Sequence, residues 1–297
     1  MRFTYAESMT DPSFYGPLAM AAEEAGYHSM VIPDSICYPL HADSVYPYSP
    51  DGTREFLEDK PFLEPFSLIP ALGAVTSRIR FIPFVVKVPV RNPVLLAKQV
   101  TSTAVLTGGR LSLGVGVSPW REDYDILGAD WATRGRRLDD SIAIVRGLAA
   151  GGYFEYHGTT YDLPPVKIAP VPAEPVPVLI GGHSEAALRR AARLGDGWMH
   201  GGGDPADLPR LLARLSELRR DADPGPDRAG RSVIPFEVHV ISMDAYTLDG
   251  VRRLAEAGVT DVIIGFRWPY VTGPDTEPLA TKIDSLRRFA DDVIAKA

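Results

Sequence analysis

Four consecutive residues of this sequence, Gly181, Gly182, His183 and Ser184, have the types and the spacing to bind an anion. They follow the apolar run 178–180, which indicates a buried strand, and they precede a helical pattern for which Ser184 is a suitable N-cap. Such a turn directs the backbone N–H groups of residues 182–184 into one small space at the positive end of the helix dipole. The pattern predicts a phosphate site, although two glycines are also typical of an ordinary strand-to-helix turn.

Three acidic or imidazole side chains are expected at or in strands, where they could move a proton. Glu7 ends the first predicted strand and is a candidate general base. His200 ends the sixth predicted strand. If the strands form a barrel, as argued below, alternation along this strand predicts that the His200 side chain points into the open end of the barrel, where it could act as a ligand or an acid. His239 shares one strand face with Glu237, which favours either an acid–base contact or a buried polar layer.

Three larger side chains are candidates for substrate contact. Arg267 and Trp268 follow the last predicted strand, where an arginine could bind an anionic substrate or only close the barrel end. Trp120 follows the fourth strand and could stack on a ligand or pack in the core.

No metal site is expected, because the histidines lack H-E-x-x-H or H-x-x-x-H spacing. Serine hydrolysis has no support either, because the G-x-S-x-G pattern is absent from the sequence.

Composition limits the partners and the location of the protein. The 297 residues carry 31 Lys and Arg against 38 Asp and Glu, a net charge of −7, which argues against nucleic acid and anionic membranes as partners. Cys37 is the only cysteine, so an internal disulfide is excluded. No leader-like or membrane-spanning apolar run stands in the sequence, and we therefore expect a cytoplasmic enzyme with a small-molecule substrate.

The elements that must position these residues alternate between strand and helix along the whole chain. Eight such pairs predict a single α/β domain over residues 1–297, a closed (β/α)8 barrel, whose active site lies at the carboxyl ends of the strands. The predicted strands are 2–8, 29–33, 79–86, 111–116, 178–180, 195–200, 233–243 and 259–266. The predicted helices are 18–25, 66–75, 93–106, 134–148, 185–194, 208–218, 247–257 and 279–295, and 117–131 is expected to be a loop.

Two insertions interrupt this alternation, one after the second strand and one before the fifth. Segment 36–62 contains His41, Tyr48 and several prolines, and its aromatic content favours an ordered substrate cover over a mobile linker. Segment 153–175 is rich in Pro, Tyr and Gly and is expected to form a small hairpin excursion. We expect both insertions to lie over the active-site face and to select a partly apolar, ring-containing substrate.

Two long motifs give the chain a family resemblance. Segments 91–128 (RNPVLLAKQVTSTAVLTGGRLSLGVGVSPWREDYDILG) and 175–198 (PVPVLIGGHSEAALRRAARLGDGW) resemble the bacterial luciferase-like flavin and deazaflavin oxidoreductases. The order of elements agrees over essentially the whole chain. The wording of the second motif is most similar to the branch that uses coenzyme F420, and the FMN-dependent branch is close to it.

The resemblance implies a role for several residues. The turn 181–184 would hold the ribityl phosphate of the cofactor. The end of the third strand would form a bulge with a non-proline cis peptide against the ring system, and the end of the fourth would line the same ring. The residues implied at these two strand ends are Pro83, Phe84, Val85, Gly116, Val117 and Ser118. Asp34 matches an acid found after the second strand in many members, whereas Ser35 stands where many have a histidine proton donor.

The predicted function is an F420-dependent oxidoreductase that transfers a hydride between the deazaflavin and a small organic substrate. The first alternative is an FMN-dependent monooxygenase that uses dioxygen and a separate flavin reductase. The second is a non-catalytic barrel that binds a phosphorylated ligand. Members of the family often form homodimers, and the apolar helix face 96–105 is the candidate interface.

Overall fold

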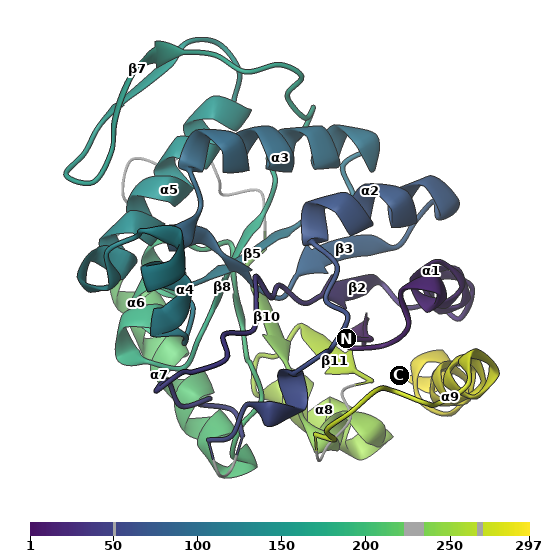
Figure 1. The fold of residues 1–297 in the computed structure, drawn as a ribbon. Helices are drawn as coiled ribbons and strands as arrows, with labels where there is room; N and C mark the ends of the chain where they lie inside the picture. The colour runs from purple at the N-terminus through teal and green to yellow at the C-terminus, as the bar shows by residue number, and fades with distance from the viewer. Residues whose placement is uncertain (50–51, 223–234, 266–269) are drawn as a thin grey trace.

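A nearly closed barrel of parallel strands forms the centre of this computed structural model, which describes residues 1–49, 52–222, 235–265 and 270–297 (Figure 1). The strand order is β3-β2-β1-β11-β10-β9-β8-β5-β4. The strands are β1 (Arg2–Ala6), β2 (Ser29–Ile32), β3 (Arg80–Pro83), β4 (Val86–Lys87), β5 (Leu113–Gly116), β8 (Val178–Gly181), β9 (Gly197–Met199), β10 (Glu237–Val240) and β11 (Asp261–Ile264).

Strands β3 and β4 are two halves of one barrel strand. β3 pairs with β2 and β4 pairs with β5, so the two halves connect the ends of the sheet. The Phe81 amide donates to the carbonyl of Arg110 at 2.8 Å, and the Ser112 amide donates to the carbonyl of Phe81 at 3.0 Å. These bonds join β3 to the residues before β5, and the predicted (β/α)8 barrel is confirmed.

Helices surround the barrel on the outside (Figure 1). They are α1 (Tyr15–Glu24), α2 (Pro65–Val75), α3 (Pro93–Leu106), α4 (Arg121–Leu127), α5 (Arg134–Ala149), α6 (Glu185–Leu194), α7 (Leu208–Asp221), α8 (Leu248–Glu256) and α9 (Leu279–Asp292). None of these helices, within the described residues, is long and apolar enough to cross a membrane.

Helix α4 replaces the loop that was predicted between β5 and α5. It has Glu122 and Asp123 in its first turn, where acidic side chains stabilise a helix by interacting with the positive end of its dipole. It ends at Gly128, which has the left-handed conformation (φ 67°). These start and stop signals were present in the sequence, but the helix is too short for its apolar residues to show a period.

Two apolar clusters follow from the alternation of side chains along the strands. One fills the space between strands and helices and includes Trp198. The other fills the barrel interior and consists of Ala6, Val31, Ile82, Leu179, Met199 and Ile263. Trp198 and Met199 are neighbours on β9 and therefore face opposite sides of the barrel wall. Full burial of each large apolar side chain contributes about 1.5–3 kcal/mol, so these clusters fix the register of the strands.

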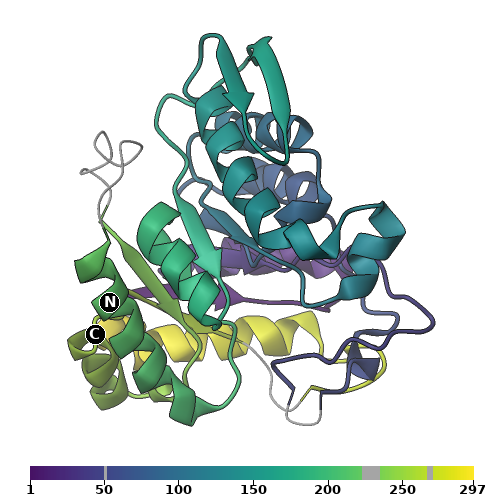
Figure 2. The same ribbon diagram turned by 90° about the vertical axis from the view of Figure 1, so that its left-hand side faces the viewer.

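The second insertion forms the expected hairpin, with β6 (Phe154–His157) antiparallel to β7 (Asp162–Val166). It packs on α5, where the Tyr156 hydroxyl donates to Asp140 at 2.9 Å and the Phe154 ring lies against Gly147. Figure 2 shows the hairpin at the edge of the molecule, far from the loop that follows β2. The expectation that this insertion covers the active-site face is therefore wrong, and the hairpin extends the outer side of α5.

Candidate active site

The turn after β8 has the geometry predicted for an anion site. Gly182 has a φ of 114°, a conformation that favours glycine, and the Ser184 hydroxyl accepts the Ala187 amide at 3.2 Å as the N-cap of α6. Strand β9 holds the turn from the other side, because the Trp198 indole donates to the Gly182 carbonyl at 2.9 Å. The first amides of α6 lack acceptors within the helix and lie at its positive end.

Two stacked histidines border this turn. The rings of His183 and His200 lie 4.5 Å apart at an angle of 10°, and neither ring nitrogen of His200 has a hydrogen-bond partner in the described part of the chain. Burial lowers the pKa of His183 to about 4, and burial together with the neighbouring His183 lowers the pKa of His200 to about 3. Both rings are therefore neutral at pH 7.

The orientation of His200 differs from the prediction. Its ring lies 5.7 Å from that of Trp198, on the side of β9 that faces the outer core. It therefore does not point along the barrel axis into the mouth, as alternation was expected to place it. Alternation along β9 explains the difference, since Met199 occupies the inner side and its two neighbours must take the outer side.

The break between β3 and β4 brings three strand ends together. The Phe84–Val85 peptide is cis, as the family resemblance implies. The Val85 side chain lies between Gly116 at the end of β5 and Gly181 at the end of β8. A Cβ atom would lie 2.7 Å from Val85 Cγ2 at Gly116 and 3.0 Å from Val85 Cγ1 at Gly181. Only glycine fits at Gly116 without a shift of Val85.

A network of buried charges holds these strand ends from behind. Asp34 accepts the Lys87 amide at 2.9 Å and pairs with Arg91 at 2.8 Å. The Lys87 ammonium lies 2.9 Å from Asp123, and the Ser118 hydroxyl donates to the same carboxylate. The structure thus places Asp34 and Ser118 at the expected strand ends, where their side chains are engaged in fixing the backbone. Val117, between β5 and Ser118, remains partly exposed.

The first insertion spans the mouth of the barrel. It makes three ring contacts: Tyr46 stacks on Trp120 (5.5 Å, 9°), Tyr48 meets His183 edge-on (5.1 Å), and Phe56 stacks on Tyr270 (4.2 Å, 5°). These partners follow β5, β8 and β11, so the loop lies against three sides of the carboxyl-terminal face. Trp120 and Tyr48 thus both take part in ring contacts at the barrel mouth, whereas His41 is exposed, and the substrate roles of all three stay predictions.

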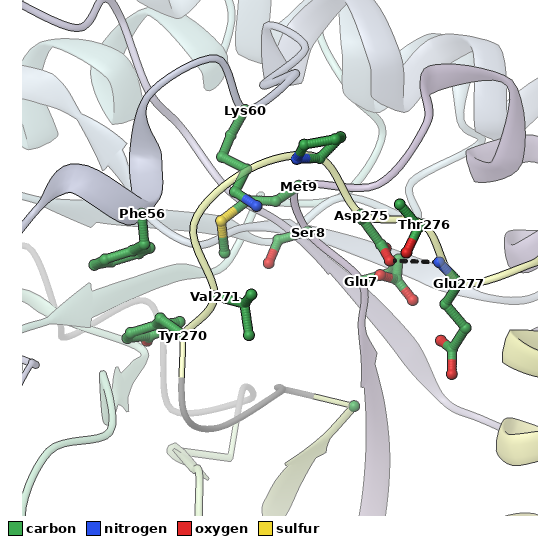
Figure 3. A pocket seen from close by; sticks show the side chains of 12 residues that line it. Glu7, Ser8, Met9, Phe56, Lys60, Tyr270, Val271, Asp275, Thr276 and Glu277 are labelled. Atoms are coloured by element: carbon green, nitrogen blue, oxygen red, sulfur yellow. Dashed lines mark hydrogen bonds between the residues drawn. The ribbon is translucent and has the colours of Figure 1, made fainter.

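A cavity of about 320 Å³ opens between the ends of β1 and β11 (Figure 3). One end is apolar, with Phe56, Tyr270 and Val271, and the other is acidic, with Glu7 and Asp275. In the closed strand order, β1 is separated from β8 by β2, β3/β4 and β5 on one side and by β11, β10 and β9 on the other. We refer to residues 181–184 as the anion turn. The cavity and the anion turn therefore lie on opposite sides of the barrel mouth.

Tyr5 and Lys282 help to fix Glu7 in this cavity. It is 4% exposed, and the Tyr5 hydroxyl donates to its Oε2 at 2.9 Å. The ammonium of Lys282 on α9 lies 3.2 Å from Glu7 Oε1, 2.5 Å from Asp275 and 3.5 Å from Glu277. Lys282 thus ties β1, α9 and the segment after β11 together. Glu7 follows β1 as predicted and lines the cavity, and its role as a general base stays a prediction.

His239 lies at the other end of the barrel. Its Nε2 is 2.8 Å from Glu237 and 3.6 Å from Asp261, and Arg2 bonds Asp261 at 2.6 Å. Three of these partners are the first residues of their strands, so the group forms a polar layer at the amino ends, away from the mouth. This location favours the polar-layer alternative for His239 and argues against an acid–base role at the mouth. The three acidic and imidazole groups have the spacing of metal ligands, but Arg2 already donates to two of them.

Comparison with known proteins identifies the family of this chain. The sequence model of the family described as luciferase-like monooxygenase matches residues 4–266. The chain belongs to this luciferase-like family. It is 60% identical over 296 residues to the uncharacterized protein Rv0940c of Mycobacterium tuberculosis, and the match covers 100% of both chains.

More distant luciferase-like relatives have assigned activities. The chain is 30% identical over 264 residues to an F420-dependent glucose-6-phosphate dehydrogenase of Nakamurella multipartita, covering 86% of this chain and 71% of that protein. Its fold resembles the monooxygenase RslO1 of Streptomyces bottropensis (TM-score 0.73, 18% identity, 100% and 99% coverage). It also resembles the coenzyme F420-dependent tetrahydromethanopterin reductase of Methanopyrus kandleri (TM-score 0.72, 15% identity, 99% of both chains).

Sequence reasoning missed several residues of this candidate site. Lys87 at the end of β4 and Asp123 in the first turn of α4 form a buried pair, and Lys282 reaches Glu7 from the last helix. Their sequence separations leave no local signal, because the pairs meet only when the barrel closes. The candidates Arg267 and Trp268 lie outside the described residues, so their substrate role stays a prediction.

Proposed function

We propose that this chain is an F420-dependent oxidoreductase that transfers a hydride between the deazaflavin and a small organic substrate. The anion turn at residues 181–184, on one side of a barrel mouth with a cavity on the other, is the observation that carries the proposal. The F420-dependent enzymes among its relatives support the choice of cofactor. If the purified protein does not bind F420, the proposal is overturned.

The residues at the mouth fit a phosphate-bearing ring cofactor. The backbone of Gly182, His183 and Ser184 would hold the phosphate, and the Phe84–Val85 peptide would contact the ring system. Bound F420 supplies a two-electron hydride carrier. The protein contributes the placement of both reactants, and the loop 36–62 excludes water through its aromatic contacts with the strand ends.

The cavity beside Glu7 is our candidate substrate site. Its apolar end, formed by Phe56, Tyr270 and Val271, suits a ring-containing substrate. Glu7 lies at the acidic end, held by Tyr5 and Lys282, and is the group we assign to proton transfer. Asp34 is less suited to that role, because both of its carboxylate oxygens bond Arg91.

An FMN-dependent monooxygenase with a partner flavin reductase is the second candidate. It is favoured by the family description and by the resemblance to the monooxygenase RslO1. A barrel that binds a phosphorylated ligand without catalysis is the third. All three share the anion turn, so only the identity and the reactivity of the bound ring distinguish them.

Cofactor binding separates these candidates. The purified protein is titrated with F420, FMN and riboflavin, and binding is measured by fluorescence. We expect submicromolar to micromolar affinity for F420 and weaker binding of FMN. Preferred binding of FMN, with consumption of dioxygen when FMN is reduced, would support the monooxygenase. Binding of phosphate esters without either ring cofactor would support the third candidate.

We also propose that the protein is a homodimer. The face 96–105 named from the sequence is not available, because Leu96, Val100 and Ala104 are buried in the core. The neighbouring side of α2 and α3 exposes Val75, Leu95, Val105 and Leu106, and α3 has Lys98 as its only charged residue. An exposed apolar face of this kind is typical of a subunit interface.

A further inference from the structure

The stacked pair of His183 and His200 has features that holding a cofactor in place does not require. A strand-to-helix turn binds phosphate through its backbone, so any side chain would serve at these two positions. Here two imidazoles lie face to face at 4.5 Å, and one of them, His200, is 2% exposed. A buried polar ring without a partner costs free energy, which is recovered when a ligand supplies one.

The hydrogen bonds define where protons can be gained. His183 Nε2 accepts the Gly201 amide at 3.0 Å, so in the neutral ring the hydrogen is on Nδ1, which is a donor. Neither nitrogen of His200 makes a hydrogen bond of good geometry among the described residues, although the backbone of Ile241 lies close enough to favour the protonated ring, and one nitrogen must be unprotonated in the neutral ring. The pair can therefore donate to an anion and can also take up a proton.

The charged groups around the pair leave it neutral. Asp207 favours protonation of both rings and Arg210 opposes protonation of His183, but these two residues pair with each other at 2.7 Å. Tyr48 from the covering loop meets His183 edge-on and is uncharged at neutral pH. An anion at the turn would be the first net charge next to the two rings.

We propose that His183 and His200 are the proton-accepting half of the phosphate site, so that binding of the cofactor phosphate and protonation of this pair are coupled. The inference rests on the proposed function, because the phosphate is that of the bound cofactor. The two histidines would then increase the affinity for the cofactor phosphate through their positive charge, in addition to their packing in the turn. The ligand class is an organic phosphate whose negative charge persists at the pH of binding.

The sign of the coupling follows from the pKa values. In the free protein both rings are neutral above about pH 4. A bound anion stabilises the imidazolium and raises the pKa, and by linkage a lower pH must then strengthen binding. If the anion raises the pKa of His200 by about three units from its free value of about 3, affinity increases about tenfold between pH 8 and pH 5. The phosphodiester of F420 keeps its charge over this range and does not contribute to the change.

The experiment measures affinity and ring protonation in parallel. F420 affinity is determined from pH 8 to pH 5 for the native protein, His200→Gln and His183→Asn. Histidine-15N spectra record the ring pKa values with and without F420. We expect the tenfold increase in the native protein, a nearly flat profile in the variants, and a higher ring pKa in the complex. The exposed His157→Asn variant is the control and keeps the native profile.

Two results separate this inference from the proposed function. Tight F420 binding that does not change with pH, with unaltered ring pKa values, overturns the coupling and leaves the oxidoreductase proposal intact. If F420 and FMN both fail to bind, the proposed function falls. Sulfate, whose charge is constant in this range, then tests the pair alone in the same spectra. A ring pKa that sulfate does not raise overturns the inference.

Discussion

Lys282 on α9 contacts Glu7 at the end of β1, with 3.2 Å between Nζ and Oε1, and the Lys282 side chain is fully buried. The same ammonium contacts Asp275 and Glu277. Lys282→Met would leave buried carboxylates without this cation, and we expect a loss of about 3–5 kcal/mol in the free energy of unfolding. Urea unfolding of the native protein and the variant measures this difference in the free energy of unfolding.

The matched control for this change is Arg287→Met, also on α9. Arg287 pairs with Glu24 on the surface, and both side chains are more than half exposed. Its removal should cost at most about 1 kcal/mol. Equal stabilities for the Lys282 and Arg287 variants would show that the buried network contributes little.

Gly116→Ala should disturb the strand ends at the proposed cofactor site. The new Cβ would meet Val85 at 2.7 Å, and overpacking of this kind costs about 1–3 kcal/mol. We expect a lower melting temperature and weaker F420 binding. Adding Val85→Ala should restore part of both, which a double-mutant cycle measures. Gly16→Ala in α1, where nothing lies within 4 Å of the new Cβ, is the control; it should leave F420 binding unchanged and should not lower the melting temperature, since alanine favours a helix more than glycine does.

Ser184→Ala tests the anion turn. It removes the N-cap of α6, which costs about 1 kcal/mol of stability, and it should weaken F420 binding as well. Thr247→Ala removes the equivalent cap of α8, far from the turn, with a similar cost in stability. The prediction fails if the two variants bind F420 equally well in a fluorescence titration.

Glu23 makes a pH-dependent contribution to stability. Burial alone would raise its pKa, but the amides of Ile79, Arg78 and Ser77 donate to the carboxylate and lower the pKa to about 2. The stabilisation is therefore complete above the unfolded pKa of about 4.5 and is lost as the pH falls toward about 2. Glu23→Gln should destabilise the protein at pH 6 and much less at pH 3. The neighbouring, exposed Glu24→Gln should show no such difference in denaturant unfolding.

Leu106→Glu tests the proposed dimer. Leu106 is 68% exposed at the end of α3, so the substitution should not affect the fold but would place a charge in the apolar α2–α3 face. Analytical ultracentrifugation should show a dimer for the native protein and a monomer for the variant. Ile126→Glu, an exposed apolar residue of α4, should remain dimeric. A native monomer at micromolar concentration would contradict the proposal.

Local patterns in the sequence were enough for the barrel and for the capped strand-to-helix turn, whose binding of an anion stays a prediction. Strand and helix alternate because apolar residues recur with the periods of buried strands and amphipathic helices, and this recurrence does not depend on distant contacts. The turn at Gly181, Gly182, His183 and Ser184 was equally predictable, since a glycine pair and an N-cap act through adjacent residues. The cis peptide at Val85 was implied by family resemblance.

Tertiary structure alone decided which polar groups meet. Glu7 and Lys282 are 275 residues apart, and barrel closure brings them into contact. His200 and His239 both lie in or at predicted strands, yet one faces the outer core beside the anion turn and the other joins a polar layer at the opposite end. A strand pattern predicts that side chains alternate between two faces. Which face points into the barrel, and which residue of the neighbouring strand lies opposite, depend on the register of the strands. Register is fixed only when all eight strands pack around one core.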